Sequence, residues 1–388
     1  MKKQKICIIG GSLTGLVTAI SLSRLGCDID IITDNIGKNL KSNRTIAVSQ
    51  DNLDFLNKLN ISKNLKKEIW SCSRMKLYAG RNKEKFSEVF ELDNEDKERK
   101  ILYMLENSKI MKLMIKKIKK IKSISIKNNK KVLSISNSGL LKRVEFKNNY
   151  SFKYHLVIIC TGQNSNLIKD YFNYKTIKSS YKESAITTIL KHKHLKNNTV
   201  RQIFLKNEIF ALLPISNTKT SIVWSVKNSI KNKNNFLLKE KIKFYAENFL
   251  KNINFSTKIE NKDLNFLIRN KYYLDRILLF GDALHVIHPF VGQGFNMTLR
   301  DLYSLNRILN QKINLGLDIG SSDILSEFSE EMKPRNFIYS LGIDFLRNCF
   351  SIENQSFQEV RNQVIKILNK NNLAKDVFYK LADVGLKF

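Results

Sequence analysis

The stretch GDALHVIHPFVGQGFN, residues 281–296, is the part of the sequence that says most about the fold of this chain. The 388 residues include only 15 Gly and 3 Pro. Three of those glycines, one proline and two of the five histidines fall within this stretch: Gly281, Gly292, Gly294, Pro289, His285 and His288. Glycine opens the backbone to close approach and proline fixes its direction. The pattern therefore predicts a loop that passes a ligand and leads into a helix.

A second glycine-rich stretch, GGSLTG at residues 10–15, follows an apolar run near the N-terminus. Residues 5–9 predict a strand, 16–25 a helix and 28–33 a second strand that ends near Asp34. An acidic residue about 20 positions beyond such glycines is typical of a dinucleotide-binding unit. Glycines let the backbone approach a pyrophosphate, helix amides bind it, and the carboxylate can accept hydrogen bonds from a ribose.

This N-terminal pattern departs from GxGxxG at one position, because Ser12 stands where the middle glycine is usual. A tight strand-to-helix turn without a ligand is the alternative interpretation. The basic and then apolar start also resembles a signal peptide, but cleavage would remove the glycine pattern. We therefore favour a strand, a glycine turn and a helix.

Composition limits the classes of protein that this chain can represent. Hydrophobic residues make up 43% of it, enough for one large domain or two joined ones. Its 67 Lys and Arg against 35 Asp and Glu give a net charge of +32. Such a charge attracts anionic partners, although a composition rich in Lys, Asn and Ile explains it equally well. No RNA-binding signature or zinc-finger spacing is present, which argues against nucleic acid.

Cysteine usage and hydropathy indicate the compartment. The five cysteines are odd in number and lack CxxC spacing, which favours a reducing compartment and argues against a disulfide framework or a metal site. No apolar run reaches the roughly 18 to 20 residues of a membrane span. We expect a cytoplasmic protein whose membrane contact, if it has one, is peripheral and at the inner face.

The rest of the chain alternates between helical and extended patterns. Helices are predicted over 50–70, 104–121, 237–251, 296–311 and most of 322–385, and strands over 131–160, 177–265 and 277–280.

Three motifs now stand in order: GGSLTG at 10–15, CTGQNS at 160–165 and the opening stretch at 281–296. Together they resemble the class A FAD-dependent aromatic monooxygenases, and within them the ubiquinone-biosynthesis hydroxylase branch. Shorter matches extend the resemblance over nearly the whole chain: RTIAVS at 44–49, YMLEN at 103–107, ALLPI at 211–215, SIVWSV at 221–226 and IDFLRNCFS at 343–351.

The resemblance implies an α/β fold, in which a glutathione-reductase-type, Rossmann-like FAD-binding domain carries an inserted antiparallel β-sheet substrate domain and a helical C-terminal tail. It assigns residues 1–72, 103–176 and 266–388 to the FAD-binding domain, and 73–102 and 177–265 to the substrate domain.

The resemblance also implies which residues bind FAD. In this interpretation Asp282 bonds a ribityl hydroxyl, Pro289 stiffens the loop beside the reactive edge of the flavin, and the following helix start stabilises negative charge on the reduced flavin. The predicted cofactor-binding residues are Gly10, Ser12, Leu13, Thr14, Gly15, Asp34, Arg44, Gly162, Gly281, Asp282, Pro289, Gly292, Gln293, Gly294 and Asn296. For Arg44, a solvated surface charge is the alternative, and Glu106 and Asn107 are open in the same way.

The two histidines and the middle motif qualify this picture. His285 and His288 are interpreted as structural hydrogen-bonding groups rather than as a metal site or a general base, and no catalytic residue is predicted. The family usually has an acidic residue before Gly162 and often an arginine further on, where this chain has Thr161 and Ile168. FAD binding is expected to survive this change, whereas reduction by NAD(P)H is less secure.

The activity implied by the resemblance is ring hydroxylation of a polyprenylated phenol in ubiquinone biosynthesis, with NAD(P)H and O2, through a flavin C4a-hydroperoxide. An apolar wall would keep the site dry, and its candidates, for which core packing is the alternative, are Leu212, Leu213, Pro214 and Trp224. Two other functions stay open. One is another flavoenzyme of the same fold, such as a prenyl reductase, and the other is a non-catalytic lipid-binding or assembly subunit of the quinone pathway.

Overall fold

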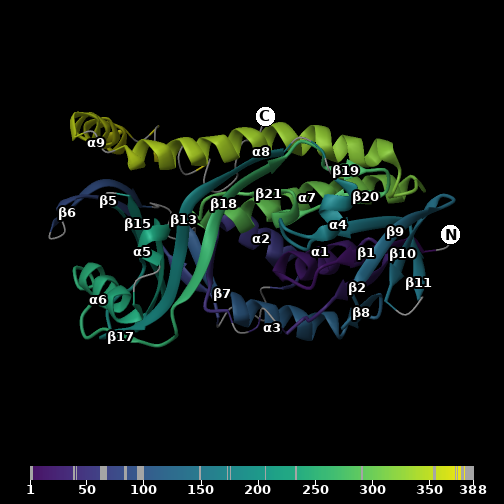
Figure 1. Ribbon diagram of the computed structural model, residues 1–388, viewed down its shortest axis with the longest axis horizontal. Coiled ribbons are helices and arrows are strands. Elements are labelled where there is room, and N and C mark those ends of the chain that lie inside the picture. The colour runs from purple at the N-terminus through teal and green to yellow at the C-terminus, as the bar shows by residue number, and fades with distance from the viewer. Residues whose placement is uncertain are drawn as a thin grey trace.

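The protein is described by a computed structural model. The described residues are 3–37, 40, 42–61, 68–82, 85–93, 100–147, 150–172, 174, 176–205, 207–231, 234–289, 292–352, 355–371, 373, 375, 376 and 380. Two large sheets lie one after the other along the longest axis, and helices cover their faces (Figure 1).

The first large sheet has six strands and is parallel except at one edge. Its central strands are buried at nearly every position, as expected for a parallel sheet covered on both faces. In order across the sheet the strands are β19 (Tyr273–Leu274), β20 (Ile277–Leu279), β12 (Leu156–Ile159), β1 (Lys5–Ile9), β2 (Asp28–Thr33) and β8 (Ile124–Asn128).

The second large sheet has nine strands. Its long strands β13 and β18 run from this sheet toward the first one (Figure 1). In order the strands are β21 (His285–Val286), β18 (Glu260–Arg269), β13 (Thr176–Lys191), β16 (Lys219–Lys227), β15 (Glu208–Ser216), β14 (Thr199–Leu205), β5 (Arg74–Asn82) and β6 (Lys85–Asp93), with β17 (Asn254–Phe255) paired to β13. The sheet is mixed rather than purely antiparallel, because β14 and β5 pair in parallel.

Two three-stranded sheets complete the β structure. One lies between the large sheets and the other extends from the N-terminal end of the molecule (Figure 1). Their strands are β3 (Thr45–Val48), β7 (Leu102–Glu106) and β4 (Trp70–Cys72) in the first, and β11 (Ser151–Tyr154), β10 (Leu141–Phe146) and β9 (Val132–Ser138) in the second.

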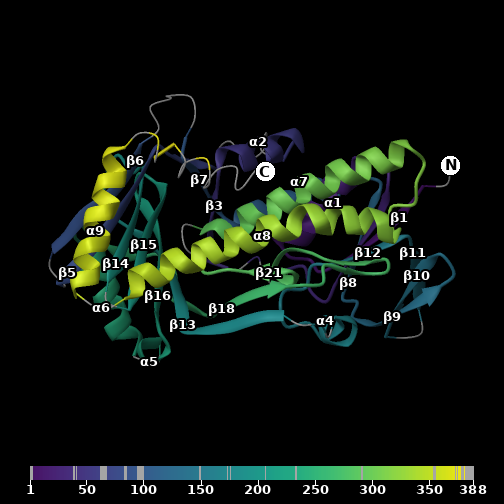
Figure 2. The ribbon, with the colours of Figure 1, turned by 90° about the horizontal axis from the view of Figure 1, so that it is seen from above.

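The helices lie on the faces and ends of these sheets. The long helices α7 and α8 run side by side along one side of the molecule, and α9 follows beyond them (Figure 2). Their bounds are α1 (Leu13–Ser23), α2 (Gln50–Lys58), α3 (Asn107–Ile118), α4 (Asn166–Tyr171), α5 (Asn228–Lys231), α6 (Asn235–Ala246), α7 (Gln293–Asn314), α8 (Ser322–Ser351) and α9 (Gln355–Lys370). None of the described helices combines the length and apolar character needed to cross a bilayer.

Three predicted helices need correction. The helix expected over 104–121 begins only at Asn107, because Leu102–Glu106 pairs as β7 with β3 and β4. The helix expected over 50–70 ends at Lys58, and residues 62–67 of that range lie outside the described residues. The first helix begins three residues earlier than predicted, at Leu13. In the tail, residues 377–379 and 381–385 of the predicted range also lie outside the described residues.

Candidate FAD site

The three sequence motifs meet at the carboxyl ends of neighbouring strands. GGSLTG follows β1, CTGQNS follows β12 and GDA follows β20, and these three strands are adjacent in the six-stranded sheet. The chain leaves β1 toward β2 on one side and enters β12 on the other, so the topology reverses beside β1. Open α/β sheets bind ligands in the crevice at such a point.

Two glycines let the first turn close tightly. A Cβ atom on Gly15 would lie 2.0 Å from the carbonyl oxygen of Gly10, and one on Gly10 would lie 2.6 Å from the carbonyl oxygen of Cys160. Gly10 also has a φ of +125°, which a residue with a side chain rarely adopts. These contacts hold α1 against the ends of β1 and β12.

Glycines also bring the third motif against the first. A Cβ atom on Gly281 would lie 2.6 Å from Cγ2 of Thr14, and one on Gly292 would lie 2.9 Å from Cβ of Ala47 in β3. The short 3₁₀ helix η3 (Gly281–Ala283) is therefore packed on the first turn of α1, and the start of α7 is packed on β3.

Two other glycines face open space. A Cβ atom added to Gly162 or Gly294 would meet nothing within 4 Å. Both lie in the segments that the sequence assigns to cofactor binding, and Gly294 is in the first turn of α7. Open backbone at these positions is what close approach of a planar cofactor requires, so the residues present fit FAD.

The starts of α1 and α7 supply hydrogen-bond donors to this space. The N-cap of α1 is Ser12, whose side chain makes no capping bond, and the N-cap of α7 is Gly292, which has no side chain. The first four backbone N–H groups of a helix have no partner within it, and the positive end of the helix dipole lies there. Both helix starts therefore favour a bound anion.

Three charged residues lie in or near the third motif. Asp282 is exposed in η3, and Arg44 is exposed just before β3. Desolvation and the nearby Arg44 lower the pKa of Lys262 on β18, and Asp282 acts in the opposite direction. The loop that carries Arg44 is fixed to β18 and α3, since the Asn43 backbone N–H donates to Glu260 Oε1 at 3.0 Å and the Arg44 carbonyl accepts from the Asn107 N–H at 2.9 Å.

Lys262 is a residue that the sequence did not single out. It pairs in register with Ala185 of β13, which places both residues on one face of the sheet. Because 67 Lys and Arg are spread along the chain, one lysine in a strand carries no recognisable pattern. Glu106, which the sequence left open as a cofactor contact, forms an ion pair with Lys109 at 2.7 Å beside α3.

Asp34 and Thr161 both lie at strand ends beside the glycine turn. Asp34 is exposed directly after β2, and Thr161 is exposed directly after β12. Gly162 has a φ of +83°. Ile168, which stands where the family often has arginine, is buried in α4 and packs in the core of the six-stranded sheet.

Asn296 and Gln293 are engaged by protein groups through their side chains. Asn296 Oδ1 accepts from the Ser49 backbone N–H at 3.1 Å, and its Nδ2 donates to the Ala47 carbonyl at 3.1 Å. Gln293 Oε1 accepts from the Tyr339 hydroxyl at 2.7 Å. Both side chains are thus tied to the protein, and the cofactor contact of these two residues stays a prediction.

His285 is held in a buried structural contact. Its Nε2 lies 2.6 Å from Asp301 Oδ2, and Asp301 Oδ1 accepts from Asn336 Nδ2 at 2.8 Å. The histidine and the aspartate are almost fully buried. This chain of contacts ties the loop after η3 to α7 and α8, in keeping with the structural role predicted for this imidazole.

His288 has a different environment. It is buried, but neither ring nitrogen makes a hydrogen bond with a described residue. Glu183 Oε2 lies 3.4 Å from His288 Nε2, the ring of Tyr181 packs edge-on at 5.2 Å, and Arg347 bonds Glu183. Burial lowers the pKa of His288, while Glu183 acts in the opposite direction.

The four residues predicted to wall the substrate pocket do not share one face of the sheet. Leu212 and Trp224 pack beneath α6, and the Trp224 indole N–H donates to Glu208 Oε2 at 3.1 Å. Leu213 points to the other face, where it packs with Ala47 and Met104. Successive residues of a strand alternate between faces, so Leu212 and Trp224 do not share a wall with Leu213, which is on the face that packs against Ala47. For Pro214 the assignment stays a prediction.

The face that carries Leu213 is apolar and contains a buried polar group that the sequence analysis missed. Ser221 of β16 pairs in register with Leu213 and is fully buried, and its hydroxyl has no hydrogen-bond partner among the described residues. An unpaired buried hydroxyl is unfavourable unless a ligand satisfies it. The sequence does not distinguish a strand serine that can bind a ligand from one that only packs in the core.

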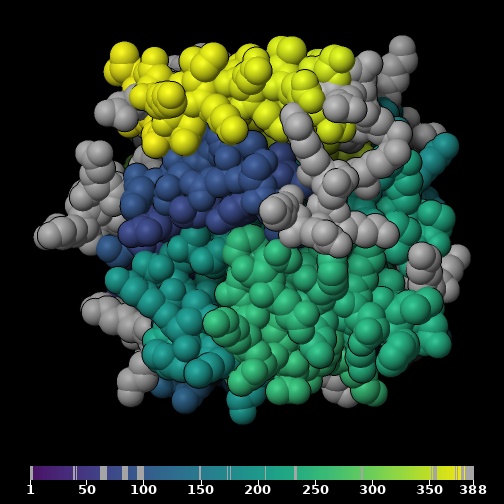
Figure 3. Space-filling model, turned by 90° about the vertical axis from the view of Figure 1, so that its left-hand side faces the viewer, coloured from purple at the N-terminus to yellow at the C-terminus, as the bar shows by residue number. Residues whose placement is uncertain are grey.

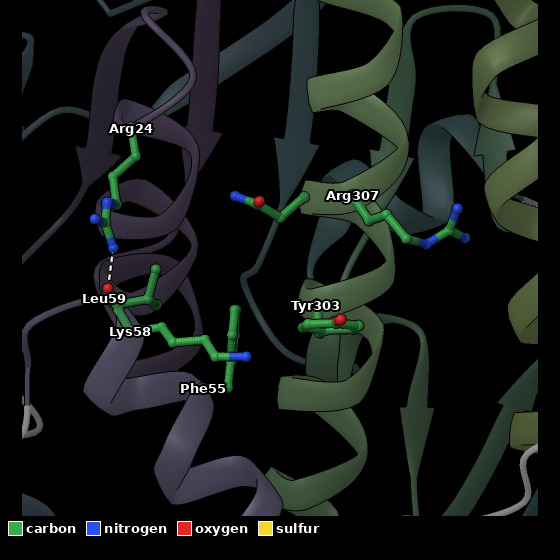
Figure 4. A pocket seen from close by; sticks show the side chains of 7 residues that line it. Arg24, Phe55, Lys58, Leu59, Tyr303 and Arg307 are labelled. Atoms are coloured by element: carbon green, nitrogen blue, oxygen red, sulfur yellow. Dashed lines mark hydrogen bonds between the residues drawn. The ribbon is translucent and has the colours of Figure 1, made fainter.

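A pocket of about 290 Å³ lies elsewhere, at the other ends of α1 and α2 (Figure 4). Arg24 donates there to the carbonyl of Lys58, and Arg307 pairs with Glu331. Because α1 has 11 residues and rises about 1.5 Å per residue, this pocket is roughly 16 Å from the glycine turn. It is not part of the candidate site.

Metal chemistry finds no support among the described residues, where no three His, Cys, Asp or Glu side chains are grouped to hold an ion. All five cysteines are free thiols.

Three glycine-containing motifs at adjacent strand ends of a parallel sheet, with a large mixed sheet next to it, are the arrangement of FAD-dependent enzymes. A model of the FAD binding domain family matches residues 3–336, and the chain belongs to this family.

Similar proteins narrow the class. The chain is 24% identical to a ubiquinone biosynthesis monooxygenase COQ6 of Dictyostelium discoideum, over 96% of this chain and 89% of the relative. A p-nitrophenol 4-monooxygenase of Pseudomonas putida superposes with a TM-score of 0.83 at 13% identity, covering 100% and 99% of the two chains. A variant of HpxO from Klebsiella pneumoniae, complexed with FAD, superposes with a TM-score of 0.78 at 14% identity, covering 98% and 99%. This chain is a class A FAD-dependent monooxygenase.

Proposed function

We propose that this chain hydroxylates the aromatic ring of a polyprenylated phenol in ubiquinone biosynthesis. The observation that carries the proposal is the convergence of three FAD-type motifs at adjacent strand ends, in a chain similar over nearly its full length to a COQ6 monooxygenase. The net reaction would consume one phenol, one O2, one NAD(P)H and one proton, and would give one hydroxylated phenol, one water and one NAD(P)+.

We also propose which residues hold FAD. The open backbone at Gly162 and Gly294 and the two helix starts support the assignment. The proposed set is the predicted one with Lys262 added: Gly10, Ser12, Leu13, Thr14, Gly15, Asp34, Arg44, Gly162, Lys262, Gly281, Asp282, Pro289, Gly292, Gln293, Gly294 and Asn296. FAD, reduced by NAD(P)H, would supply the activation of O2, which amino-acid side chains in general do not provide.

The chain's own groups would provide charge, dryness and orientation. Arg44, Lys262 and the start of α7 bring positive charge to one place, which favours negative charge on a bound cofactor or on a phenolate. The apolar face around Leu213 and Val223 excludes water. The unpaired hydroxyl of Ser221 on this face is available to a polar substituent of the ring.

The experiment that tests the function uses the purified, FAD-loaded protein with a prenylated phenol in detergent, NAD(P)H and isotopically labelled O2. We expect one labelled oxygen atom on the ring of the product, measured by mass spectrometry, and no product without O2. Label that comes from water would exclude the monooxygenase reaction. Flavin reduction without any hydroxylated product would favour a reductase, and flavin that NAD(P)H does not reduce would favour a non-catalytic subunit.

A further inference from the structure

The C-terminal helix α9 has its apolar side outward. Phe357, Val360, Val364 and Ile367 are exposed by 39%, 59%, 49% and 67%. Their spacing of three, four and three residues places them on one face of the helix. A surface helix of a globular protein normally turns such a face inward, because burial of apolar area stabilises the fold.

The inward side of α9 contacts the protein through both apolar and polar groups, and its Ile365 packs in the core. Asn369 Oδ1 accepts from the Glu91 backbone N–H of β6 at 3.0 Å. The Arg361 guanidinium donates to the carbonyl of Cys349 at 3.2 Å and lies 4.6 Å from the centre of the Phe350 ring. Figure 3 shows α9 in yellow across the top of the molecule, directly above β5 and β6 in blue. The outward apolar side is therefore fixed by specific contacts on the inward side.

Helix α8 carries a second exposed apolar stripe. Phe337, Ile338, Leu341 and Phe345 are exposed by 38%, 45%, 41% and 66% and lie along one stripe of the helix. Both helices lie on the same side of the molecule (Figures 1 and 2). We call these eight residues the C-terminal apolar face: Phe337, Ile338, Leu341, Phe345, Phe357, Val360, Val364 and Ile367.

Charge indicates what covers this face. The exposed Lys366 and Lys370 flank the apolar stripe of α9, and the whole chain carries +32. A second copy of the chain would bring an equal positive charge to the contact, which opposes association. An anionic bilayer complements both the apolar stripe and the charge, and an amphipathic helix that cannot span a membrane lies in the plane of its surface.

We propose that the C-terminal apolar face docks this chain on the surface of an anionic lipid bilayer, with α9 in the headgroup region. The inference rests on the proposed function for its purpose, since a prenylated phenol is held in membranes. The same two helices also pack inward, where Ile343, Phe350 and Ile365 belong to one hydrophobic cluster with Phe204 of β14.

The test compares the full chain with two triple variants in sedimentation with vesicles. One variant changes the face: Val360→Asn, Val364→Asn and Ile367→Asn. The matched control changes three exposed leucines elsewhere, namely Leu133→Asn, Leu140→Asn and Leu315→Asn, which are exposed by 56%, 78% and 72%. The vesicles are phosphatidylcholine alone or phosphatidylcholine mixed with phosphatidylglycerol.

We expect the face variant to bind the anionic vesicles at least about tenfold more weakly than the wild type, because three apolar side chains no longer enter the interface. The control variant should bind as the wild type does. Equal binding by the face variant and the wild type would overturn the proposal. A wild type that is dimeric and becomes monomeric only in the face variant would also overturn it, since a second copy would then cover the face.

A second measurement avoids dependence on the triple variant. Val364→Trp in the otherwise unchanged chain should lose fluorescence on binding vesicles that contain brominated lipid, and absence of quenching would contradict the docking. Hydroxylation of a detergent-dispersed phenol separates the two proposals. Wild-type protein that docks without hydroxylating any phenol would contradict the proposed function alone, whereas an active enzyme whose face variant docks normally would contradict the docking alone.

Discussion

Asp282 and His285 lie three positions apart in one motif but do different work. Asp282 is exposed among Arg44 and Lys262, whereas His285 is buried against Asp301. The histidine is held by contacts within the protein, so its replacement should lower the free energy of unfolding. No described residue forms a comparable hydrogen bond or ion pair with the Asp282 side chain, which is consistent with a role toward a ligand.

We predict that Asp282→Ala weakens FAD binding more than His285→Ala does. A hydrogen bond to a charged group contributes about 1.5 to 3 kcal/mol, so the dissociation constant should rise by roughly tenfold to a hundredfold. Flavin fluorescence titration of the apoprotein measures it, and His285→Ala should instead lower the free energy of unfolding. If Asp282→Ala binds FAD as tightly as the wild type, the assignment of this residue is wrong.

His288 should make stability depend on pH in a defined direction. Burial lowers the pKa of His288 in the fold, and the facing groups are Glu183, Arg347, Asp344 and Tyr181. In the unfolded chain a histidine titrates near its ordinary pKa of about 6.5. As the pH falls below that value, the unfolded state gains a proton that the folded state does not, and stability is lost.

His288→Gln should therefore flatten the dependence of the free energy of unfolding on pH between about 7 and 5. In the wild type Glu183 contributes little in this window, because contacts with His288 and Arg347 outweigh burial and hold the pKa of its carboxyl below the usual range. Urea denaturation at several pH values gives the slope, and the exposed His194→Gln variant should keep that of the wild type. An unchanged slope in His288→Gln would show that another group causes the pH dependence.

At the scale of elements, the sequence pattern predicted those strands and turns whose contacts are close together in the sequence. The first strand, the glycine turn and the second strand were predicted because their pattern lies within about 30 residues, and β1 and β2 confirm the two strands. Residues 104–106 were predicted as helix and belong to a strand, because their partners β3 and β4 are distant in sequence. The parallel pairing of β5 with β14 was likewise invisible, since it joins segments more than 100 residues apart.

The start of α7 allows a test that separates cofactor binding from folding. A side chain at Gly294 would enter open space, so Gly294→Val should leave the free energy of unfolding of the apoprotein within about 1 kcal/mol of the wild type. If FAD occupies that space, the same variant should bind it at least about tenfold more weakly, which corresponds to about 1.4 kcal/mol.

The matched control is Gly342→Val in α8, where an added Cβ would also meet nothing within 4 Å. This variant should bind FAD as the wild type does, as measured by the same fluorescence titration. Undiminished FAD binding in Gly294→Val would show that the cofactor does not approach this helix start, and the assignment of α7 would then have to be given up.

At the scale of the whole molecule, the site depends on strand order, which the motifs alone do not contain. No strand order was predicted, and the sheet places β1, β12 and β20 side by side. The proposed roles of Lys262 and Ser221 likewise depend on the pairing of β18 and β16 in the nine-stranded sheet, and neither residue belongs to a motif. The outward apolar side of α9 was equally inaccessible, since a helical pattern does not say which face will be covered.

Net charge is also a property of the whole molecule. The salt dependence of membrane binding tests whether this charge has a function. If the charge of +32 assists docking, binding to anionic vesicles should fall at least about tenfold as the Debye length shortens from about 30 Å at 0.01 M to about 8 Å at 0.15 M ionic strength. Vesicle sedimentation at both ionic strengths measures this, and binding to neutral vesicles should be weak and nearly independent of salt. The variant with three asparagines on α9 should bind more weakly at both salt concentrations yet keep the salt dependence, because its charge is unchanged. Equal binding of the wild type to anionic and neutral vesicles at low salt would mean that the positive charge reflects composition alone, and that only the apolar face remains to attract the membrane.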